Sequence, residues 1–253
     1  MRLFGLIGYP LEHSFSKKYF TQKFEDEDIQ DAKYVNFPLQ SIEEFPALIK
    51  QEEQLTGLNV TLPYKEQVLE YLDDTEEAVK EIKAVNTIKI YQDNAGKKKL
   101  KGFNTDYHGF IESLEPLLSK RHHNALILGT GGASKAVAFA LKKLNISFRF
   151  VSRNAKKKDN TLSYSDINEK NIKGFHLIVN TTPLGMHPNT QSAPQIPYQA
   201  LTKDHILYDL VYNPKETKFM SEGKKYGAIT KNGLDMLYLQ AEKAWEIWNS
   251  SGF

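Results

Sequence analysis

A glycine-rich turn is the first part of this sequence whose residue types and spacing could do chemistry. It follows the apolar run 125–128 and precedes a helical pattern, a context in which backbone N–H groups can approach a pyrophosphate. Ser134 occupies the third glycine position of the G-x-G-x-x-G pattern, which serves helix packing and accepts a small side chain. The turn predicts a dinucleotide site, with an ordinary tight turn as the alternative. Its residues are Gly129, Thr130, Gly131, Gly132, Ala133 and Ser134.

The next predicted strand ends in a basic segment that indicates which dinucleotide binds. An NAD enzyme normally has Asp or Glu there for the ribose 2′-hydroxyl, but no acidic residue occurs from Gly129 to Lys158. The predicted strand instead ends at Ser152. Arg153 and Asn154 follow it directly, and three lysines come shortly afterwards. A guanidinium and nearby ammonium groups match the charge of a 2′-phosphate. We therefore predict NADP, with Arg153 as the main contact, against the alternative of a solvated basic loop.

The N-terminal half has hydroxyl, amide and amine groups near predicted strand and helix ends. Ser14 and Ser16 lie beside a helix start, where an anionic group could accept hydrogen bonds. Asn59, Thr61 and Lys65 lie where a strand gives way to a helix with proline in its first turn, so we expect them at one strand-end crevice. Each of these residues alone is also explained by capping or by a turn.

Two further segments place polar groups at element ends. Asn86 precedes the predicted strand 87–91, and Asp106 follows the predicted strand 100–103. They offer an amide and a carboxylate. Taken singly, each is again explained by a turn or a cap.

Alternating strands and helices must position these residues, which predicts an α/β fold. Residues 87–103 form a hairpin around a polar turn, and the second half is expected to be a doubly wound, Rossmann-type parallel sheet. Predicted strands are 3–7, 34–37, 58–61, 87–91, 100–103, 125–128, 148–152, 177–180, 206–210 and 228–230. Predicted helices start near Ser14 or Ser16 and cover 42–50, 64–71, 107–118, 136–144 and 234–248.

The same patterns predict two domains followed by a C-terminal helix. Residues 1–106 form an N-terminal α/β domain, 107–232 the Rossmann domain, and 233–253 a C-terminal helix. The helical pattern that begins at Tyr107 joins the two domains. The last helix carries an apolar stripe that ends in Trp245 and Trp248, so we expect it to pack back on the N-terminal domain.

Composition excludes several classes of function. The 253 residues carry a formal net charge of +2, which does not favour nucleic acid as a partner. Without cysteine there is no disulfide framework or thiolate nucleophile, and the histidines lack metal-binding spacing, so we expect no metal. No apolar run is long enough for a membrane span or a signal peptide, which predicts a cytoplasmic protein. Hydrolase elbow and P-loop motifs are also missing.

Together the motifs resemble those of the shikimate dehydrogenase family over essentially the whole chain. The segments GYPLEHSFS, GLNVTLPYK, AVNTI, GFNTD, GTGGAS, NTTPLGM, YDLVYNP and NGLDML occur in that family's order and at compatible spacing. The resemblance implies an N-terminal substrate domain, a C-terminal NADP-binding Rossmann domain and an active site in the cleft between them. It also implies reversible, NADP-linked reduction of 3-dehydroshikimate to shikimate in aromatic amino-acid biosynthesis. The sequence is compatible with both a monomer and a homodimer.

The resemblance also implies roles for particular residues. Ser14 and Ser16 match the pair that binds the substrate carboxylate, and Lys65 matches the catalytic lysine with Asp106 as its partner. Asp235 is a less usual residue between the glycine and the methionine of the nicotinamide segment. The family's residues that bind the ring hydroxyls and the keto group of the substrate match Thr61, Asn86, Asp106 and Gln240. Asn59 lies beside them, and Tyr212 falls where a tyrosine lines the cleft. Gly233 and Met236 match residues that approach the nicotinamide in this family. The turn from Asn180 to Met186, which includes Thr181 and Thr182, matches a segment that borders the cofactor.

The implied chemistry suits these side chains. Hydride delivery to a ketone builds negative charge on oxygen, so a proton donor must lie within about 3 Å of it. Lys65 as an ammonium can donate that proton, and Asp106 as a carboxylate would hold the ammonium in place. From the residues alone, a structural ion pair between them is the simpler interpretation.

Two other functions are compatible with the same residues. One is a quinate or dual quinate/shikimate dehydrogenase that uses NAD, which the two serines and the basic segment at Arg153 disfavour. The other is a non-catalytic NADP-binding sensor on the same fold. The presence of both Lys65 and Asp106 disfavours a sensor, because a sensor needs neither.

Overall fold

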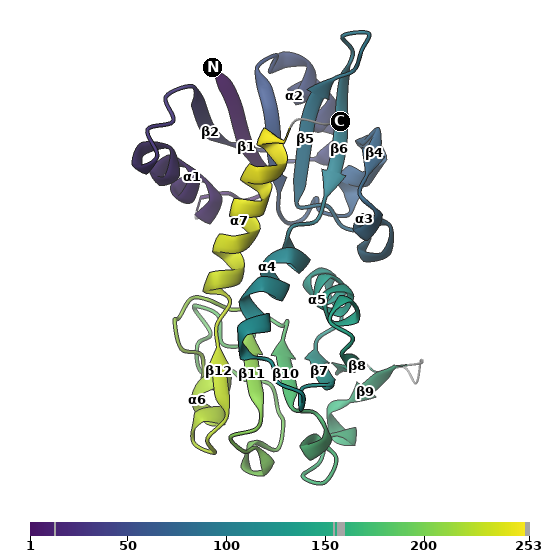
Figure 1. Ribbon diagram of the computed structural model, residues 1–253, viewed down its shortest axis with the longest axis vertical. Coiled ribbons are helices and arrows are strands. Elements are labelled where there is room, and N and C mark those ends of the chain that lie inside the picture. The colour runs from purple at the N-terminus through teal and green to yellow at the C-terminus, as the bar shows by residue number, and fades with distance from the viewer. Residues whose placement is uncertain (13, 154, 156–159, 251–253) are drawn as a thin grey trace. The chain divides into compact units, whose positions relative to one another are not determined.

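The computed structural model describes residues 1–12, 14–153, 155 and 160–250. The chain forms two compact units, one made of Met1–Thr105 with Ala241–Phe253 and the other of Asp106–Gln240. Each unit contains one sheet with helices packed on it (Figure 1). The predicted α/β class is therefore confirmed.

The sheet of the first unit has the strand order β2-β1-β3-β5-β6-β4. β1 pairs in parallel with β2 and β3, whereas β5 pairs antiparallel with β3 and β6, so the predicted hairpin is present. The strands are β1 (Arg2–Gly8), β2 (Ala32–Pro38), β3 (Leu55–Val60), β4 (Asp74–Thr75), β5 (Thr87–Gln92) and β6 (Lys98–Phe103). The helices are α1 (Phe15–Asp26), η1 (Ile42–Glu44), α2 (Phe45–Gln51), η2 (Gln67–Tyr71) and α3 (Glu77–Ile82).

The predicted helix 64–71 is only partly correct. A short 3₁₀ helix, η2, forms over Gln67–Tyr71, and turns precede it. The Lys65 carbonyl accepts a hydrogen bond from Val85 N at 2.7 Å, and Leu69 N donates to Glu66 O instead. Because the Lys65 carbonyl bonds to another part of the chain, the regular i to i−4 ladder cannot continue through this residue. The segment that follows β3 is thus tied to the residues that lead into β5.

The last helix, α7 (Leu234–Asn249), completes the core of the first unit with its C-terminal part, as the apolar stripe predicted. The Trp248 ring stacks on Phe4 with 4.9 Å between the ring centroids, and its indole N–H donates to Ile88 O at 3.0 Å. A Cβ atom on Gly57 would lie 2.3 Å from the indole nitrogen, so only glycine fits beneath the ring. Packing and a satisfied buried donor therefore both hold α7 in place.

We expect Trp248→Ala to lower the free energy of unfolding by about 3–5 kcal/mol, the usual cost of truncating a buried large aromatic side chain. Urea denaturation followed by far-UV circular dichroism measures this change. Tyr226→Ala removes an aromatic side chain that is 43% exposed and should change stability by no more than about 0.5 kcal/mol. Equal effects of the two substitutions would contradict this role of Trp248.

The second unit contains a six-stranded, fully parallel sheet with the order β12-β11-β10-β7-β8-β9. The chain moves outward from β7 to β9, then returns to the other side of β7 for β10 to β12, which is the order of a Rossmann sheet. The strands are β7 (Asn124–Leu128), β8 (Ser147–Ser152), β9 (Thr161–Ser163), β10 (Leu177–Asn180), β11 (Ile206–Asp209) and β12 (Ile229–Lys231). The main helices are α4 (Asp106–Leu114), α5 (Gly132–Lys143) and α6 (Lys218–Lys224), with η3 (Glu115–Leu117), η4 (Tyr164–Asp166), η5 (Ile172–Gly174) and η6 (Tyr198–Ala200) between elements.

Strand β7 shows why this sheet is doubly wound. Ala125 and Ile127 pack in one core cluster with residues of α4 and α5, whereas Leu126 and Leu128 pack in another with residues of α6. Because successive side chains of a strand point to opposite faces, a strand that is apolar at every position needs helices on both faces. The crevice for a ligand is then expected where β7 and β10 meet, since the strand order reverses there. In the described part of the chain, no helix is long and apolar enough to cross a membrane.

Four histidines lie close to the amino ends of these strands: His122 and His123 before β7, His176 before β10 and His205 before β11. The ring of His176 lies 6.5 Å from that of His122 and 5.3 Å from that of His205, measured between centroids. Nδ1 of His122 accepts from Ser119 N at 2.9 Å, and Nδ1 of His205 accepts from Thr202 N at 3.1 Å. These backbone donors favour the neutral imidazole with its hydrogen on Nε2. Burial lowers the pKa of both His122 and His205.

This arrangement predicts a loss of stability in mild acid. The unfolded chain has ordinary histidines with a pKa of about 6.5, whereas the folded pKa values are lower, so the unfolded state binds more protons as the pH falls through that range. The free energy of unfolding should therefore decrease from about pH 7 downward, by at most about 1.4 kcal/mol per pH unit for each histidine. Denaturant titrations at pH 5.5 and 7.5 measure this change. His205→Asn keeps an acceptor for Thr202 N and does not titrate, so an unchanged pH dependence would refute the assignment.

Candidate functional site

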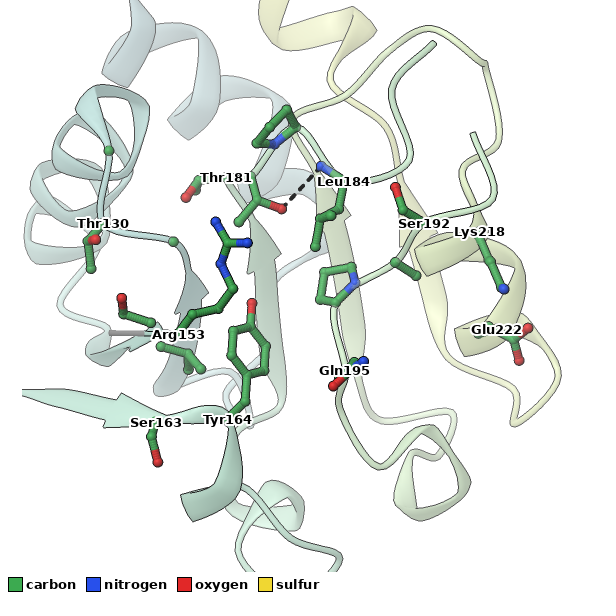
Figure 2. A pocket seen from close by; sticks show the side chains of 18 of the residues that line it. Thr130, Arg153, Ser163, Tyr164, Thr181, Leu184, Ser192, Gln195, Lys218 and Glu222 are labelled. Atoms are coloured by element: carbon green, nitrogen blue, oxygen red, sulfur yellow. Dashed lines mark hydrogen bonds between the residues drawn. The ribbon is translucent and has the colours of Figure 1, made fainter. Parts of the chain in front are cut away.

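A pocket of about 1080 Å³ lies in the second unit, at the carboxyl ends of its central strands (Figure 2). The glycine-rich turn after β7, the end of β8 and the turn after β10 form three of its walls. The pocket is lined by predicted cofactor residues from three segments: Gly129, Thr130 and Gly131; Ser152 and Arg153; and Thr181, Thr182, Pro183 and Leu184. The structure therefore brings together residues that are distant in the sequence, at the point where the strand order reverses.

The glycine-rich turn has the geometry of a dinucleotide cradle. Gly129 has φ of +113°, and a Cβ atom there would lie 2.7 Å from Thr181 Oγ1, so this position requires glycine. A Cβ atom on Gly131 would meet nothing within 4 Å, which leaves open space above the backbone. Gly131 is also the N-cap of α5, where N–H groups favour a negatively charged ligand. The residues present thus fit a bound pyrophosphate.

The residues after Gly131 begin α5 and have different environments. Gly132 and Ala133 are exposed in the first turn of the helix. Ser134 is buried, and its hydroxyl donates to Gly131 O at 2.6 Å. Ser134 therefore stabilises the turn and the helix start, which is the packing role of the third glycine in the standard pattern.

Arg153 is the basic group of the pocket. It directly follows β8, lines the pocket and is exposed. Figure 2 shows its guanidinium group between Thr181 and the Tyr164 hydroxyl group. Burial raises the pKa of Tyr164, and the charge of Arg153 opposes this shift, which also indicates that the two groups interact. Tyr164 was not among the residues predicted from the sequence. Asn154, a predicted cofactor residue, lies outside the described residues.

The turn after β10 is held by its own side chains. Thr181 Oγ1 donates to Leu128 O at 2.8 Å, which ties this turn to the end of β7. Asn180 Oδ1 accepts from Thr182 N at 3.1 Å and from Thr182 Oγ1 at 2.6 Å. Thr182 Oγ1 in turn accepts from Leu184 N at 3.3 Å, the bond drawn in Figure 2. These bonds fix the shape of the pocket wall.

Asp209 is a buried acid that the sequence analysis missed. It is the last residue of β11 and has no exposed surface. Its carboxylate accepts from Asn180 Nδ2 at 2.9 Å, from Thr217 Oγ1 at 2.6 Å and from Val211 N at 3.0 Å. Burial raises the pKa of Asp209 to about 6, although these three donors favour the ionised form. An acid and an amide that both end neighbouring parallel strands were the available signal.

Other predicted residues of the second unit do not line this pocket. Gly233 is required for packing, because a Cβ atom there would lie 2.2 Å from Leu210 O. Met236 is buried in the core, and Gln240 donates through Nε2 to Leu237 O at 2.9 Å. Tyr212 is 40% exposed after β11. Asp106 is the first residue of α4.

The predicted residues of the first unit lie near the ends of its parallel strands. Ser14 caps α1 by accepting from Lys17 N at 3.4 Å. Burial raises the pKa of Tyr34 well above its usual value, against an opposing hydrogen bond from Ser16. Thr61 and Lys65 follow β3 and are partly buried.

Asn59 and Asn86 belong to a buried polar network in the same unit. Asn59 Oδ1 accepts from Tyr34 Oη at 2.7 Å, and its Nδ2 donates to Asn86 O at 3.3 Å. Asn86 Nδ2 donates to Thr105 Oγ1 at 2.9 Å, while its Oδ1 accepts from Thr105 N at 2.7 Å. Each asparagine thus links neighbouring strand ends, as a cap would, and positions the segments that carry Thr61 and Asp106.

The fold and the pocket define a two-unit α/β protein with a Rossmann-type dinucleotide site. A family model described as the shikimate dehydrogenase substrate binding domain matches residues 6–88. A NADP(+) shikimate dehydrogenase of Methanococcus maripaludis is 41% identical, over 98% of this chain and 91% of the relative. The chain belongs to the shikimate dehydrogenase family, so the predicted resemblance is confirmed.

Solved structures agree with this assignment. A shikimate dehydrogenase crystallised with NADP+ is 33% identical, with a TM-score of 0.84 over 98% of this chain and 90% of the other. A ligand-free 5-ketofructose reductase of Gluconobacter sp. strain CHM43 is 28% identical, with a TM-score of 0.84 over 100% of this chain and 94% of the other. The same fold therefore occurs in a shikimate dehydrogenase and in a 5-ketofructose reductase.

Proposed function

We propose that this protein is an NADP-dependent shikimate dehydrogenase that interconverts shikimate and 3-dehydroshikimate. The observation that carries the proposal is the match to NADP(+) shikimate dehydrogenases along 98% of the chain. The pocket in the second unit supports it independently, because it combines an open glycine turn with an arginine at the end of β8.

NADP suits this pocket better than NAD. The pyrophosphate would bind at the Gly129–Gly131 turn, where N–H groups and the helix dipole favour negative charge. Arg153 would pair with the 2′-phosphate, and no carboxylate from Gly129 to Lys158 is present to accept from a free 2′-hydroxyl. When bound, the cofactor supplies or accepts the hydride. Gly233 and Met236 are proposed to border its nicotinamide end.

Lys65 and Asp106 are proposed as the catalytic residues. In ketone reduction the Lys65 ammonium donates a proton to the oxygen that gains negative charge, and in alcohol oxidation the neutral amine accepts it. The Asp106 carboxylate stabilises the ammonium and accepts a hydrogen bond from a ring hydroxyl. The backbone bond between Lys65 O and Val85 N supports this role, because it fixes the segment from which Lys65 extends.

The substrate is proposed to bind through hydroxyl and amide groups. Ser14 and Ser16 would donate to its carboxylate. The ring hydroxyls and the keto group would be contacted by Thr61, Asn86, Asp106 and Gln240, with Asn59 and Tyr212 beside these contacts. The bonds already made by Asn59 and Asn86 support a rigid arrangement of these groups, since a positioned donor costs no reorganisation during the reaction.

An absorbance assay of NADPH formation from shikimate and NADP tests the proposal, with NAD and quinate as crossed controls. Turnover mainly with shikimate and NADP is the expected result. Preference for quinate or NAD would contradict the assigned specificity. Binding of NADP without turnover of either substrate would instead support the sensor interpretation.

A second candidate is the reduction of a different polyhydroxylated ketone. The similarity to a 5-ketofructose reductase favours this alternative. That ketone has no carboxylate, so the Ser14 and Ser16 hydroxyls distinguish the two functions. NADPH oxidation with 3-dehydroshikimate and with 5-ketofructose, in parallel, should show activity with the carboxylate substrate; faster turnover of 5-ketofructose would favour the alternative.

A further inference from the structure

Asp209 holds together three segments for which the sequence predicted a role in the site. Through Oδ1 it accepts from Asn180, and Asn180 in turn accepts from both the amide and the hydroxyl of Thr182. Asn180 Nδ2 also donates to Leu184 O at 3.4 Å. A chain of hydrogen bonds therefore runs from the Asp209 carboxylate through the Asn180 side chain to Thr182 and Leu184 in the pocket wall.

The same carboxylate oxygen fixes the turn that follows β11. Oδ1 accepts from Val211 N, and Val211 O accepts from Gly233 N at 3.3 Å. Leu210 N donates to Asn180 O at 3.0 Å, which joins this turn to the end of β10. Two strand ends and the residue before α7 are thus bonded around one buried group.

The position of Asp209 costs stability. The side chain is fully buried, and burial raises its pKa to about 6, so a mainly ionised carboxylate is kept out of water at neutral pH. Described residues near this group include the Tyr198 phenol, whose pKa is raised by burial and then by the charges of Glu222 and Asp209. A buried carboxylate that accepts from three donors on different segments is typical of a group that orients others.

We propose that Asp209 is a positioning residue for the cofactor: through Asn180 it fixes the turn Thr181–Leu184 against which NADP binds. Asp209 itself is absent from the pocket lining. The inference rests on the proposed function for the identity of the ligand. It goes beyond that function by assigning cofactor affinity to a residue that does not contact the cofactor.

Calorimetric titration with NADP+ and no substrate tests this role. Asp209→Ala should weaken NADP+ binding by at least about 10-fold, because Asn180 Nδ2 and Val211 N lose their acceptor. Asp209→Asn keeps a carbonyl oxygen for both donors and should bind within about 3-fold of the wild type. In Asp209→Ala the KM for shikimate should rise less than the dissociation constant for NADP+.

Thr217→Val is the matched control. Thr217 donates to the other carboxylate oxygen and caps α6 by accepting from Met220 N, so its loss should lower the melting temperature without weakening NADP+ binding. Asn180→Ala interrupts the chain of hydrogen bonds between Asp209 and the pocket wall, while Val211 N and Thr217 Oγ1 still donate to Asp209. This variant should show the same loss of NADP+ affinity, and it serves as the test if Asp209→Ala does not fold.

The possible results separate the two proposals. Wild-type NADP+ affinity in Asp209→Ala or Asn180→Ala would overturn the positioning role alone. An equal loss in Thr217→Val would also overturn it, because reduced stability would then explain the effect. A wild-type protein that binds neither NADP+ nor NAD+ would overturn the proposed function and this inference with it.

Discussion

Replacing Lys65 by alanine is expected to lower kcat by about 100-fold or more, in both directions of the reaction. This is the scale of a lost general acid or base. Affinity for NADPH should change little, because Lys65 belongs to the unit Met1–Thr105, whereas every residue that lines the cofactor pocket belongs to Asp106–Gln240. Steady-state kinetics and a fluorescence titration with NADPH measure the two quantities.

The control for this experiment is Lys50→Ala. Lys50 is exposed in α2, so its loss changes the net charge equally without touching the proposed site. Asp106→Ala should also lower kcat. A Lys65→Ala enzyme with nearly wild-type kcat would remove this lysine from the mechanism and leave the structural ion pair as the better interpretation.

Replacing Arg153 by alanine is expected to raise the KM for NADP by about 10- to 100-fold and to leave that for NAD nearly unchanged. A hydrogen bond to a charged group contributes about 1.5–3 kcal/mol, which corresponds to this range. Only NADP has the 2′-phosphate that the guanidinium would bind. The ratio of kcat/KM for the two cofactors, with shikimate saturating, measures the effect.

Lys173→Ala provides the comparison for Arg153→Ala. It removes one positive charge from an exposed position of the same unit. If both variants lost NADP affinity equally, a general electrostatic attraction would explain the result. If Arg153→Ala left the cofactor ratio unchanged, the assignment of the 2′-phosphate site would be wrong.

The sequence predicted best those features that depend on neighbours along the chain. The apolar run 125–128 and the glycines after it indicated a strand, a turn and a helix, because each signal is local. Arg153 could be selected because it follows a predictable strand. The two-faced burial of β7 likewise follows from its continuous apolar character.

Features that depend on distant partners were missed or misjudged. The helix expected over 64–71 begins late because the Lys65 carbonyl bonds to Val85, and no property of the segment itself reveals this bond. Asp209 was overlooked because its importance depends on Asn180 and Thr217, which approach it only in the folded sheet. The short strands β4 and β9 were also missed, since two or three residues give too little periodicity.

The last helix has a consequence for the order in which this protein can fold during synthesis. Phe4, Phe20 and Phe24 share a core cluster with Trp248, which is translated after all the strands of the two sheets that the structure describes. Although domains generally fold as units and the N-terminal one first, the core of the first unit here is incomplete, with exposed aromatic side chains, until α7 has been translated. A ribosome that pauses shortly before Trp245 should therefore hold a nascent chain that chaperones recognise.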